Sequence, residues 1–498
     1  SRDALAPPEP AAVVQAEARL PTDDERRLHP WSWLFVLLAS VRQFIVPLGA
    51  LVVFGGRSED NWQLAGAGVV VVVLALGAVW RYFTYRYRID GDSLLVRSGL
   101  FERSLRQVPF SRIHNVALHQ TLLHRVFGVA EVKLESAGGT RPEAQMRVLK
   151  LADALALERV IRHRGQSATE ATPEASSSTN VDGETLLSLG IGEIVRLGLI
   201  SNRGMVVVAG AFALAWQVFP ERRMARLVEN ILRDAFGYVG QFNGGWMATA
   251  VSAALFVLLV LALIRAFSVV LAIVRYHGFQ LTRHGRRLTV ERGLLTRVRA
   301  SVPRRRIQAW TLREGVLHRA FGRRSLDIDT ATSQVDPNQE KPLQELAPVA
   351  TPAACDALVN HVLRDAAWPP ADWSPLHPRA WMRLLLGDLV FGVAVVAVAT
   401  WHFGSWGLLA LLWLPWAWLV ARRHAARAGY AIDGKLVAVR EGWWSRRWRF
   451  AELDKVQALE LRRSPLDRRF GMASVWVDTA GTGAMSGALR IRHLPLDE

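Results

Sequence analysis

Cationic residues recur at two fixed positions along this chain, and they are the residues best suited to chemistry. The first set comprises Arg112, Arg306 and Lys455, and the second comprises Arg125, Arg319 and Arg468. Arginine forms bidentate hydrogen bonds to phosphate, and lysine binds phosphate as a point charge. Both sets are therefore candidates for binding anionic lipid headgroups or a protein partner.

Each set also has a structural interpretation. The cation would satisfy strand carbonyl groups or pair with a carboxylate, such as Glu131 in the first copy. The second set adjoins a Phe-Gly turn, which favours the structural interpretation there. For the first set, both interpretations stay open.

No arrangement of residues typical of a catalytic site is present in the sequence. The chain lacks a Walker-type glycine-rich loop, His-Glu-x-x-His and Gly-x-Ser-x-Gly. Its 13 histidines are scattered without metal-ligand spacing, and its one cysteine, Cys355, excludes an intramolecular disulfide framework. We therefore expect no enzymatic activity, no metal site and no cofactor.

The cationic sets belong to a segment that occurs three times. The three copies, here called repeats one to three, align on Gly99, Gly293 and Gly442. Apolar residues then match without a gap across 41 residues, through a shared Phe-Gly pair at 127–128, 321–322 and 470–471. Apolar residues alternate with period two, which predicts half-buried β-strands. The match indicates one small β-domain present three times.

A helix is expected after the first two repeats, at about 151–164 and 352–366. The third repeat reaches Glu498, where that helix would begin, so it is expected to be missing or cut.

Three pairs of apolar runs precede the three repeats. They are 31–54 with 62–80, 204–219 with 246–274, and 379–403 with 405–420. A helix needs about 20 residues to cross about 30 Å of hydrocarbon, and most runs reach that length. Run 204–219 reaches it only if 197–200 contributes. The sequence predicts six transmembrane helices in three hairpins.

Arginines at the helix ends determine the expected orientation. They flank the outer boundaries of all three pairs, as at Arg81, Arg275 and Arg422. The positive-inside rule then places both ends of every hairpin, and both chain termini, in the cytoplasm. Segment 220–245 carries arginines of its own, nearly balanced by acidic residues, and it is predicted to be an amphipathic helix on the outer surface. We expect a multi-pass protein of the bacterial cytoplasmic (inner) membrane.

Two charges are recognised within the predicted spans, Arg42 and Asp388. Each is expected to cost about 2.5–3.5 kcal/mol alone at the bilayer centre. They occupy similar depths on equivalent helices, so we predict an ion pair between the first and third hairpins. Snorkelling of Arg42 to the interface is the alternative.

These observations divide the chain into nine segments. They are an N-terminal tail (1–27), hairpin one (28–81), β-domain one (82–165), a disordered linker (166–184), hairpin two (185–274), β-domain two (275–366), a linker (367–375), hairpin three (376–421) and β-domain three (422–498).

The order of these features resembles the bacterial PH-like membrane proteins of the YdbS/YdbT type. The shared marks are the strand ending in glycine, Pro109-Phe-Ser-Arg112-Ile113 with its counterpart Pro303-Arg-Arg-Arg306-Ile307, and the arginine of the Phe-Gly motif. Repeat three departs, with Glu452 in place of proline and Lys455-Val456 in place of Arg-Ile.

Three copies on one chain look like the longer, YdbT-type member. The resemblance implies an α+β fold in which each domain is a PH-like antiparallel β-sandwich with a C-terminal helix. It also implies a smaller YdbS-like partner with one PH-like domain, and for some members protection against membrane-active peptides such as bacteriocins.

Repeat two is the most basic part of the chain. Residues 275–330 contain 14 arginines and four acidic residues, a net charge of +10, and Arg283, Arg286 and Arg287 lie in its first hairpin turn. Cations near an anionic leaflet gain about 1 kcal/mol each. Such charge also suits nucleic acid, but a direct connection to two membrane helices favours lipid, and no nucleic-acid partner is expected.

The turn after each repeat glycine carries two apolar residues. They are Leu100 with Phe101, Leu294 with Leu295, and Trp443 with Trp444. These turns are expected either to dip into the membrane interface or to pack on a neighbouring repeat.

The sequence as a whole predicts a non-enzymatic membrane scaffold that binds anionic lipid or protein and organises or protects the cell envelope. The alternative is a lipid- or peptide-handling transporter.

Overall fold

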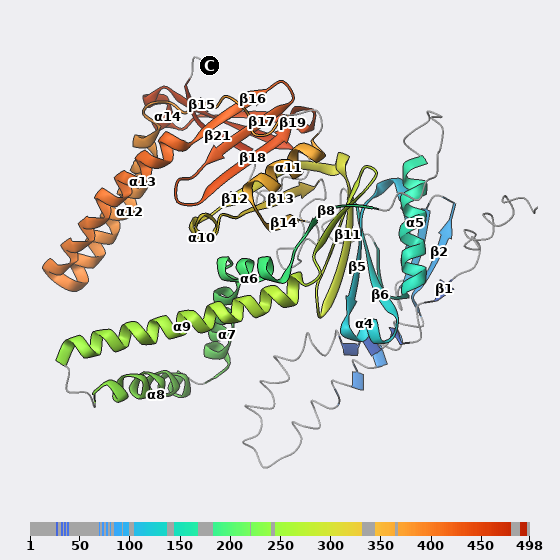
Figure 1. Ribbon diagram of the computed structural model, residues 1–498, viewed down its shortest axis with the longest axis horizontal. Helices are drawn as coiled ribbons and strands as arrows, with labels where there is room; N and C mark the ends of the chain where they lie inside the picture. Colours follow the sequence, from blue (N-terminus) through green and yellow to red (C-terminus); the bar gives the residue numbers. More distant parts are fainter. Residues whose placement is uncertain are drawn as a thin grey trace, which may run out of the picture. The chain divides into compact units, whose positions relative to one another are not determined.

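The structure is a computed structural model (Figure 1). It describes residues 26–27, scattered positions between 31 and 84, 85–98 without 92, 104–136, 144–167, 183–219, 221–240, 245–330, 344–363, 367–479 and 489–495. The chain divides into two compact units. Unit 1 comprises residues 1–136 and 142–176, and unit 2 comprises 137–141 and 177–498.

Unit 1 contains repeat one. Strands β1 (Arg26–Arg27), β2 (Arg86–Asp90), β3 (Ser93–Ser98) and β4 (Ser104–Pro109) form an antiparallel sheet in that order. After the 3-10 turn η1 (Phe110–Arg112), strands β5 (Ile113–Thr121), β6 (Val129–Ser136) and β7 (Ala144–Lys150) pair antiparallel. Helix α4 (Leu122–Val126) joins β5 to β6, and α5 (Leu151–Ser167) follows β7.

The period-two pattern of repeat one accounts for its core. Leu94 and Val96 from β3, and Val116 and Leu118 from β5, are all buried in one cluster. Helix α5 adds Leu157 to the same cluster, so the two sheets and the helix share a single core. The predicted β-sandwich with a C-terminal helix is present in repeat one.

Unit 2 contains repeats two and three. The elements of repeat two and its hairpin are β8 (Glu184–Ser188), α6 (Ile191–Ile200), α7 (Arg203–Val218), α8 (Glu221–Gly240), α9 (Gly245–Tyr276), β9 (Gln280–His284), β10 (Arg287–Arg292), β11 (Thr296–Pro303), η2 (Arg304–Arg306), β12 (Ile307–Glu314), α10 (Val316–Ala320), β13 (Arg324–Thr330), β14 (Glu345–Ala350) and α11 (Pro352–Val362).

The elements of repeat three and its hairpin follow in the same order. They are β15 (Ser374–Pro375), α12 (Ala380–Phe403), η3 (Gly404–Leu412), α13 (Trp413–Arg427), β16 (Gly429–Asp433), β17 (Leu436–Glu441), β18 (Arg446–Glu452), η4 (Leu453–Lys455), β19 (Val456–Arg462), α14 (Pro465–Phe470), β20 (Met472–Thr479) and β21 (Leu489–Pro495).

Each hairpin segment is inserted between the first and second strands of its own β-domain. Strand β1 pairs with β2, β8 with β9, and β15 with β16, although a hairpin segment separates the two strands in each case. The sheets therefore begin earlier in the chain than the predicted boundaries at residues 82, 275 and 422. These first strands have only two to five residues, which is too short to show a period-two pattern.

The segment 367–375, predicted to be a linker, is instead part of the fold. Trp368 is buried and stacks on Phe450 with 4.0 Å between ring centroids. Both its backbone N–H and its carbonyl oxygen bond to the side chain of Asn360. The proline-rich composition misled the prediction, because one large aromatic side chain is enough to anchor a short segment.

A sheet continues from repeat two into repeat three. Strand β12 pairs antiparallel with β18, so the strand order is β14-β13-β12-β18-β17-β16-β15. Trp310 and Phe450 lie opposite each other across this junction, with their rings parallel and 6.2 Å apart. The back sheet of one domain is thus completed by the front sheet of the next.

The membrane helices differ in part from the six predicted. Among the described residues, two helical stretches are long and apolar enough to cross a membrane, Ala250–Tyr276 and Ala380–Arg427. There is a third candidate span only if α6 and α7, which are bent by 54° relative to each other at Ser201–Asn202, are counted together as one span. Hairpin one lies largely outside the described residues.

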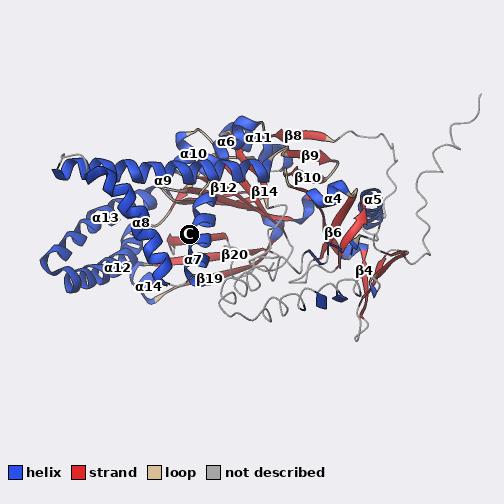
Figure 2. Ribbon diagram, turned by 90° about the horizontal axis from the view of Figure 1, so that it is seen from below, coloured by secondary structure: helices blue, strands red, loops and turns tan. Residues whose placement is uncertain are grey.

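The stretch Ala380–Arg427 folds back on itself as the predicted hairpin. Helices α12 and α13 run side by side and project from the strands (Figure 2). A Cβ on Gly407 would lie 2.5 Å from the carbonyl oxygen of Ala399, so the two backbones touch at the tip.

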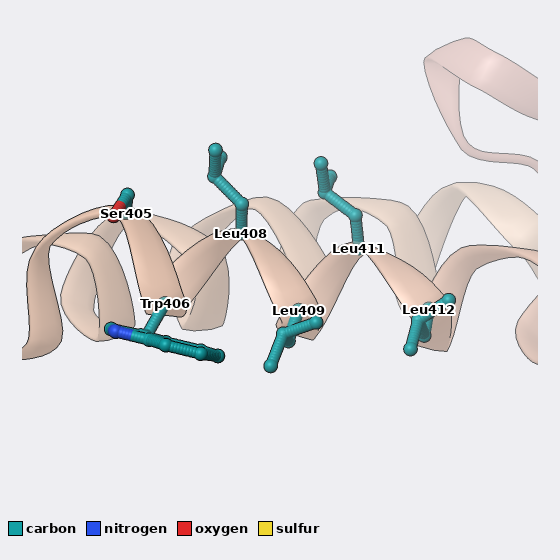
Figure 3. A pocket seen from close by; sticks show the side chains of 6 residues that line it. All are labelled: Ser405, Trp406, Leu408, Leu409, Leu411 and Leu412. Atoms are coloured by element: carbon teal, nitrogen blue, oxygen red, sulfur yellow. The ribbon is translucent and has the colours of Figure 1, made fainter.

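The tip of this hairpin is apolar on two sides. In η3, Leu408 and Leu411 point one way, and Trp406, Leu409 and Leu412 point the other way (Figure 3). A 3-10 helix has three residues per turn, so side chains three positions apart line up. Both rows are exposed, as expected of a helix surrounded by lipid.

Replacing Gly293 by alanine tests the turn that the repeats share. Its φ is +113°, and a Cβ there would overlap the carbonyl oxygen of Thr296. We expect Gly293→Ala to lower the free energy of unfolding by more than the roughly 1–2 kcal/mol that left-handed backbone alone costs. The control, Gly285→Ala, has φ +59° but open space around it. If Gly293→Ala and Gly285→Ala lose the same thermal stability in detergent, this explanation is contradicted.

Candidate functional site at the membrane end of the β-domains

The apolar turn of repeat two is attached to the end of a membrane helix. The backbone N–H of Gly293 donates to the carbonyl of His277, and that of Leu294 donates to Val274, each at 2.9 Å. We call this end of the domain the membrane-proximal end. The opposite, distal end holds η2 and the β9–β10 turn, which are joined by a bond from Arg304 N–H to the Arg286 carbonyl.

The first cationic set lies at the distal ends of the domains. Arg112, Arg306 and Lys455 each occupy the last position of a 3-10 turn, in η1, η2 and η4. Burial and the neighbouring charge of Arg305 lower the pKa of Arg306. Lys455 pairs with Asp454 at 2.9 Å, and Arg112 is exposed.

The basic residues of the β9–β10 turn are also distal. The Arg283 guanidinium lies 2.7 Å from Nε2 of His361 and 4.0 Å from the Glu184 carboxylate. Arg283 therefore has a structural role, connecting β9 to α11 and β8. Arg286 is exposed and Arg287 is half-buried beside it.

The second cationic set lies at the membrane-proximal ends. Arg319 in α10 donates to the backbone carbonyl of Trp444, in the turn of repeat three, at 2.9 Å. This bond favours a structural role for Arg319, and a ligand-binding role stays a prediction. The equivalent Arg125 in α4 and Arg468 in α14 are exposed.

The region around each Phe-Gly helix contacts the first helix of its own hairpin segment. In repeat one, His124 of α4 stacks on Phe35 with 4.2 Å between ring centroids. In repeat two, Arg323 binds Glu193 of α6 through two hydrogen bonds of 2.7 and 2.8 Å. In repeat three, Asp467 of α14 accepts a 3.0 Å hydrogen bond from Arg383 of α12. The repeats are thus attached to their hairpins in equivalent ways.

The apolar turn of repeat three packs against its membrane hairpin. The rings of Trp443 and Trp444 lie 6.3 and 6.1 Å from that of Trp416 in α13. Leu294 and Leu295 of repeat two are exposed beside the end of α9. Leu100 and Phe101 lie outside the described residues.

Tryptophan residues lie near both ends of helix α12 in hairpin three, and an arginine accompanies them at one end. Arg422 lies over the rings of Trp381 and Trp418 at 4.8 and 5.2 Å, at the end next to the β-domain. Trp401, at the other end of α12, is the most exposed tryptophan among the described residues. The 20 positions from Trp381 to Trp401 correspond to about 30 Å of helix, the thickness of the hydrocarbon core.

The Trp443–Trp444 turn therefore lies further along α13 toward the tip of the hairpin than Arg422 does. Its contact residue Trp416 lies six positions before Arg422, or about 9 Å along the helix. Aromatic rings prefer this interfacial depth. The turn packs on a helix of its own hairpin, and Arg319 connects it to repeat two. Its location at the membrane interface stays a prediction.

A buried polar cluster, not expected from the sequence, joins hairpin two to β-domain two. Glu345 of β14 accepts hydrogen bonds from Tyr276 at the end of α9, Arg203 at the start of α7, and Arg292 of β10. Burial opposes ionisation of Glu345, but the neighbouring arginines and the Tyr276 hydroxyl outweigh it and lower its pKa to about 2. The four residues lie far apart in the chain, so no local pattern could reveal them.

A third charge within the predicted spans also escaped sequence analysis. Arg265 of α9 donates to the carbonyl oxygens of Leu199 and Ser201, at 3.2 and 3.1 Å, where α6 breaks from α7. The break frees these carbonyls, and the guanidinium satisfies them. The short length of run 204–219 was the available signal. Asp388 is exposed on α12, whereas Arg42 lies outside the described residues, so their pairing remains a prediction.

The repeat geometry agrees with comparisons to known proteins. A family model described as bacterial PH domain matches residues 34–165, 234–362 and 384–498. The chain belongs to the bacterial PH domain family. The UPF0699 transmembrane protein YdbT of Bacillus subtilis (strain 168) is 23% identical over 433 residues, which cover 82% of this chain and 84% of that protein. No solved structure matches. This membrane protein thus carries three bacterial PH domains.

Asp327, close to the polar cluster, is expected to make the free energy of unfolding depend on pH. Burial raises the pKa of Asp327 from its usual 3.8 to about 6, against the attraction of Arg313. Folding then favours the protonated acid, so the stability of the parent protein should fall as pH rises from about 4 to 6 and stay lower above that. Asp327→Asn removes this penalty and should stabilise the protein at pH 7.5 by about 1–3 kcal/mol.

Thermal unfolding at pH 5 and pH 7.5 in detergent measures the effect. The control is Asp329→Asn, which breaks a 2.6 Å ion pair with Arg449 and should destabilise the protein at both pH values. An Asp327→Asn variant that keeps the pH dependence of the parent would contradict the assignment.

The depth of the Trp443–Trp444 turn is open to direct measurement. Lipids brominated near the headgroup should quench the tryptophan fluorescence of the parent more than that of Trp443→Phe/Trp444→Phe. The control variant is Trp476→Phe, because Trp476 lies in β20 of the β-domain beside Arg462 and Arg490. Equal quenching of the parent and of the double variant would place the turn in water.

Proposed function

We propose that this chain is a non-enzymatic scaffold of the bacterial cytoplasmic membrane, with six spans and both termini in the cytoplasm. Its PH domains lie against the inner leaflet and bind anionic lipid and protein. It assembles with a smaller YdbS-like membrane protein that carries one such domain, and the assembly protects the envelope against membrane-active peptides.

The insertion of each hairpin segment between two paired strands is the observation that carries this proposal. A domain attached by a single linker can swing, whereas these domains are held by two strands and by the contacts of the Phe-Gly region. A rigid orientation suits a scaffold, because it presents the same face of every domain to the membrane.

The two ends of a domain suit different ligands. Tryptophan and leucine turns with nearby arginines at the membrane-proximal end suit a leaflet of anionic lipid. Arg305 and Arg306 lie at the other end of β11, whose eight residues span about 26 Å. That distance exceeds the Debye length of about 8 Å in physiological salt. The first cationic set is therefore better placed for a protein partner than for the lipids of its own leaflet.

A lipid- or peptide-handling transporter is the second candidate. The break between α6 and α7, with Arg265 on the freed carbonyls, favours it, because broken helices line substrate sites in many transporters. Substrate-dependent flux in proteoliposomes that is lost in Arg265→Ala would support this candidate over the scaffold.

Affinity purification from native membranes in mild detergent, followed by mass spectrometry of proteins and lipids, tests the scaffold. We expect a stoichiometric small membrane protein together with anionic lipid. Arg305→Ala/Arg306→Ala should reduce recovery of the protein at least tenfold and spare the lipid, and Trp443→Ala/Trp444→Ala should do the reverse.

Arg233→Ala is the control, because Arg233 is exposed on α8 and pairs only with Glu229 among the described residues. Recovery of this chain alone, with neither ligand enriched over that in a preparation of an unrelated membrane protein, would contradict the proposal.

A further inference from the structure

Strand β19 of repeat three has an unpaired edge. It pairs with β20 on one side, and no other described strand lies on its second side. Leu459 and Leu461 are 68% and 63% exposed. The equivalent residues of β12, Trp310 and Leu312, are 2% and 0% exposed. An exposed strand edge with apolar side chains is a template for pairing with another strand.

The pairing of β12 with β18 shows what covers such an edge in this fold. Trp310, Thr311 and Leu312 lie opposite Phe450, Arg449 and Trp448. Side chains reinforce the backbone pairing, since Arg449 bonds to Asp329 at 2.6 Å and Arg304 to Glu452 at 3.3 Å. Glu452, the residue that departs from the repeat pattern, is thus part of the junction.

In repeat two, the C-terminal helix α11 packs on β13 and β14 of the same sheet. Repeat three has no such helix among the described residues. A helix alone shields a sheet face but leaves the backbone N–H and carbonyl groups of an edge strand unpaired. Only another strand can pair with the edge of β19 in the way that β18 pairs with β12.

Unit 1 carries the complementary edge. Strand β4 is the last strand of its sheet, and Leu105 on it is 69% exposed. The ungapped repeat alignment makes β4 the counterpart of β18, because Leu105 stands six residues after Gly99 as Trp448 stands six after Gly442. Among the described strands, each copy of the chain thus has one unpaired edge of the β12 type, on β19, and one unpaired edge of the β18 type, on β4.

We propose that β19 of one copy pairs antiparallel with β4 of a second copy, in the register of β12 with β18. Transferring that register by the repeat offsets places Leu461 opposite Leu105, Leu459 opposite Gln107, and Glu460 opposite Arg106. Two exposed leucines then cover each other, and a carboxylate faces a guanidinium. Glu460, which pairs with Arg462 at 2.7 Å on the surface, gains a second cation across the strands.

This contact is heterologous, because it joins different surfaces of the two copies. Heterologous contacts generate closed rings or open chains rather than isolated symmetric dimers. The hairpins keep every copy in the same orientation in the membrane, which favours a ring in the membrane plane. The proposal is independent of the lipid and of the smaller partner.

Disulfide trapping between two differently tagged chains tests the contact. One chain carries Leu105→Cys and the other Leu461→Cys, and both are expressed together in native membranes and oxidised. Burial raises the pKa of the native Cys355 thiol to about 12, so it stays unreactive and need not be replaced. We expect a cross-linked species containing both tags. Arg106→Cys with Leu461→Cys, out of register and on the opposite face, should yield at least tenfold less.

A charge exchange supplies an independent readout in the same membranes. Glu460→Arg should reduce trapping at least fivefold, and Glu460→Arg combined with Arg106→Glu should restore it. Both side chains are exposed, so neither change should impair folding.

Three outcomes would overturn the proposal. The first is the absence of a two-tag product when both chains are present in the membrane. The second is a cross-link only within one chain carrying both cysteines. The third is a cross-link from Leu461→Cys to a different protein.

Discussion

Unit 2 depends on the pairing of one sheet edge between two repeats. Strand β12 pairs with β18 of the next repeat, so neither domain is a complete sandwich by itself. The stacked rings of Trp310, Phe450 and Trp368 lie at this junction, and the ion pairs around it involve residues of both repeats. A change at the junction therefore affects two domains at once, whereas a change in the β9–β10 turn affects one.

A few contacts also attach each β-domain to its hairpin segment. Each Phe-Gly region contacts the first helix of its hairpin segment, yet the chemistry differs between an aromatic stack, a bidentate Arg–Glu pair and an Arg–Asp hydrogen bond. The place of contact between domain and hairpin is thus the same in all three repeats, while the residue types differ. This is expected when the contact serves to hold each domain in position relative to its hairpin. The arginines of repeat two are divided between its ends, with Arg319 bonded to the turn of repeat three at one end and Arg306 in η2 at the opposite end.

The sequence predicted the repeat, its strands and its helices well, because periodic patterns such as Leu94/Val96 and Val116/Leu118 report directly on burial. It predicted the amphipathic α8 and the third hairpin from composition alone. It could not predict the short first strands, which show no period, or the Glu345 cluster, whose members are brought together only by the fold. It could not predict that α6 and α7 are separate helices, since Arg265 and the bend at Ser201–Asn202 become visible only in three dimensions.

The position of the hairpin segment within each domain has a consequence for biogenesis. Strand β8 leaves the ribosome about 90 residues before β9, which corresponds to roughly 5–20 s of synthesis. During that time the membrane insertion machinery must accept the intervening helices, since β9 cannot reach β8 until the chain has returned to the side of the membrane on which β8 lies. Each sheet can therefore be completed only if its hairpin was inserted in the correct direction. A chain inserted the wrong way would retain an incomplete domain, which cellular proteases degrade as unfolded protein.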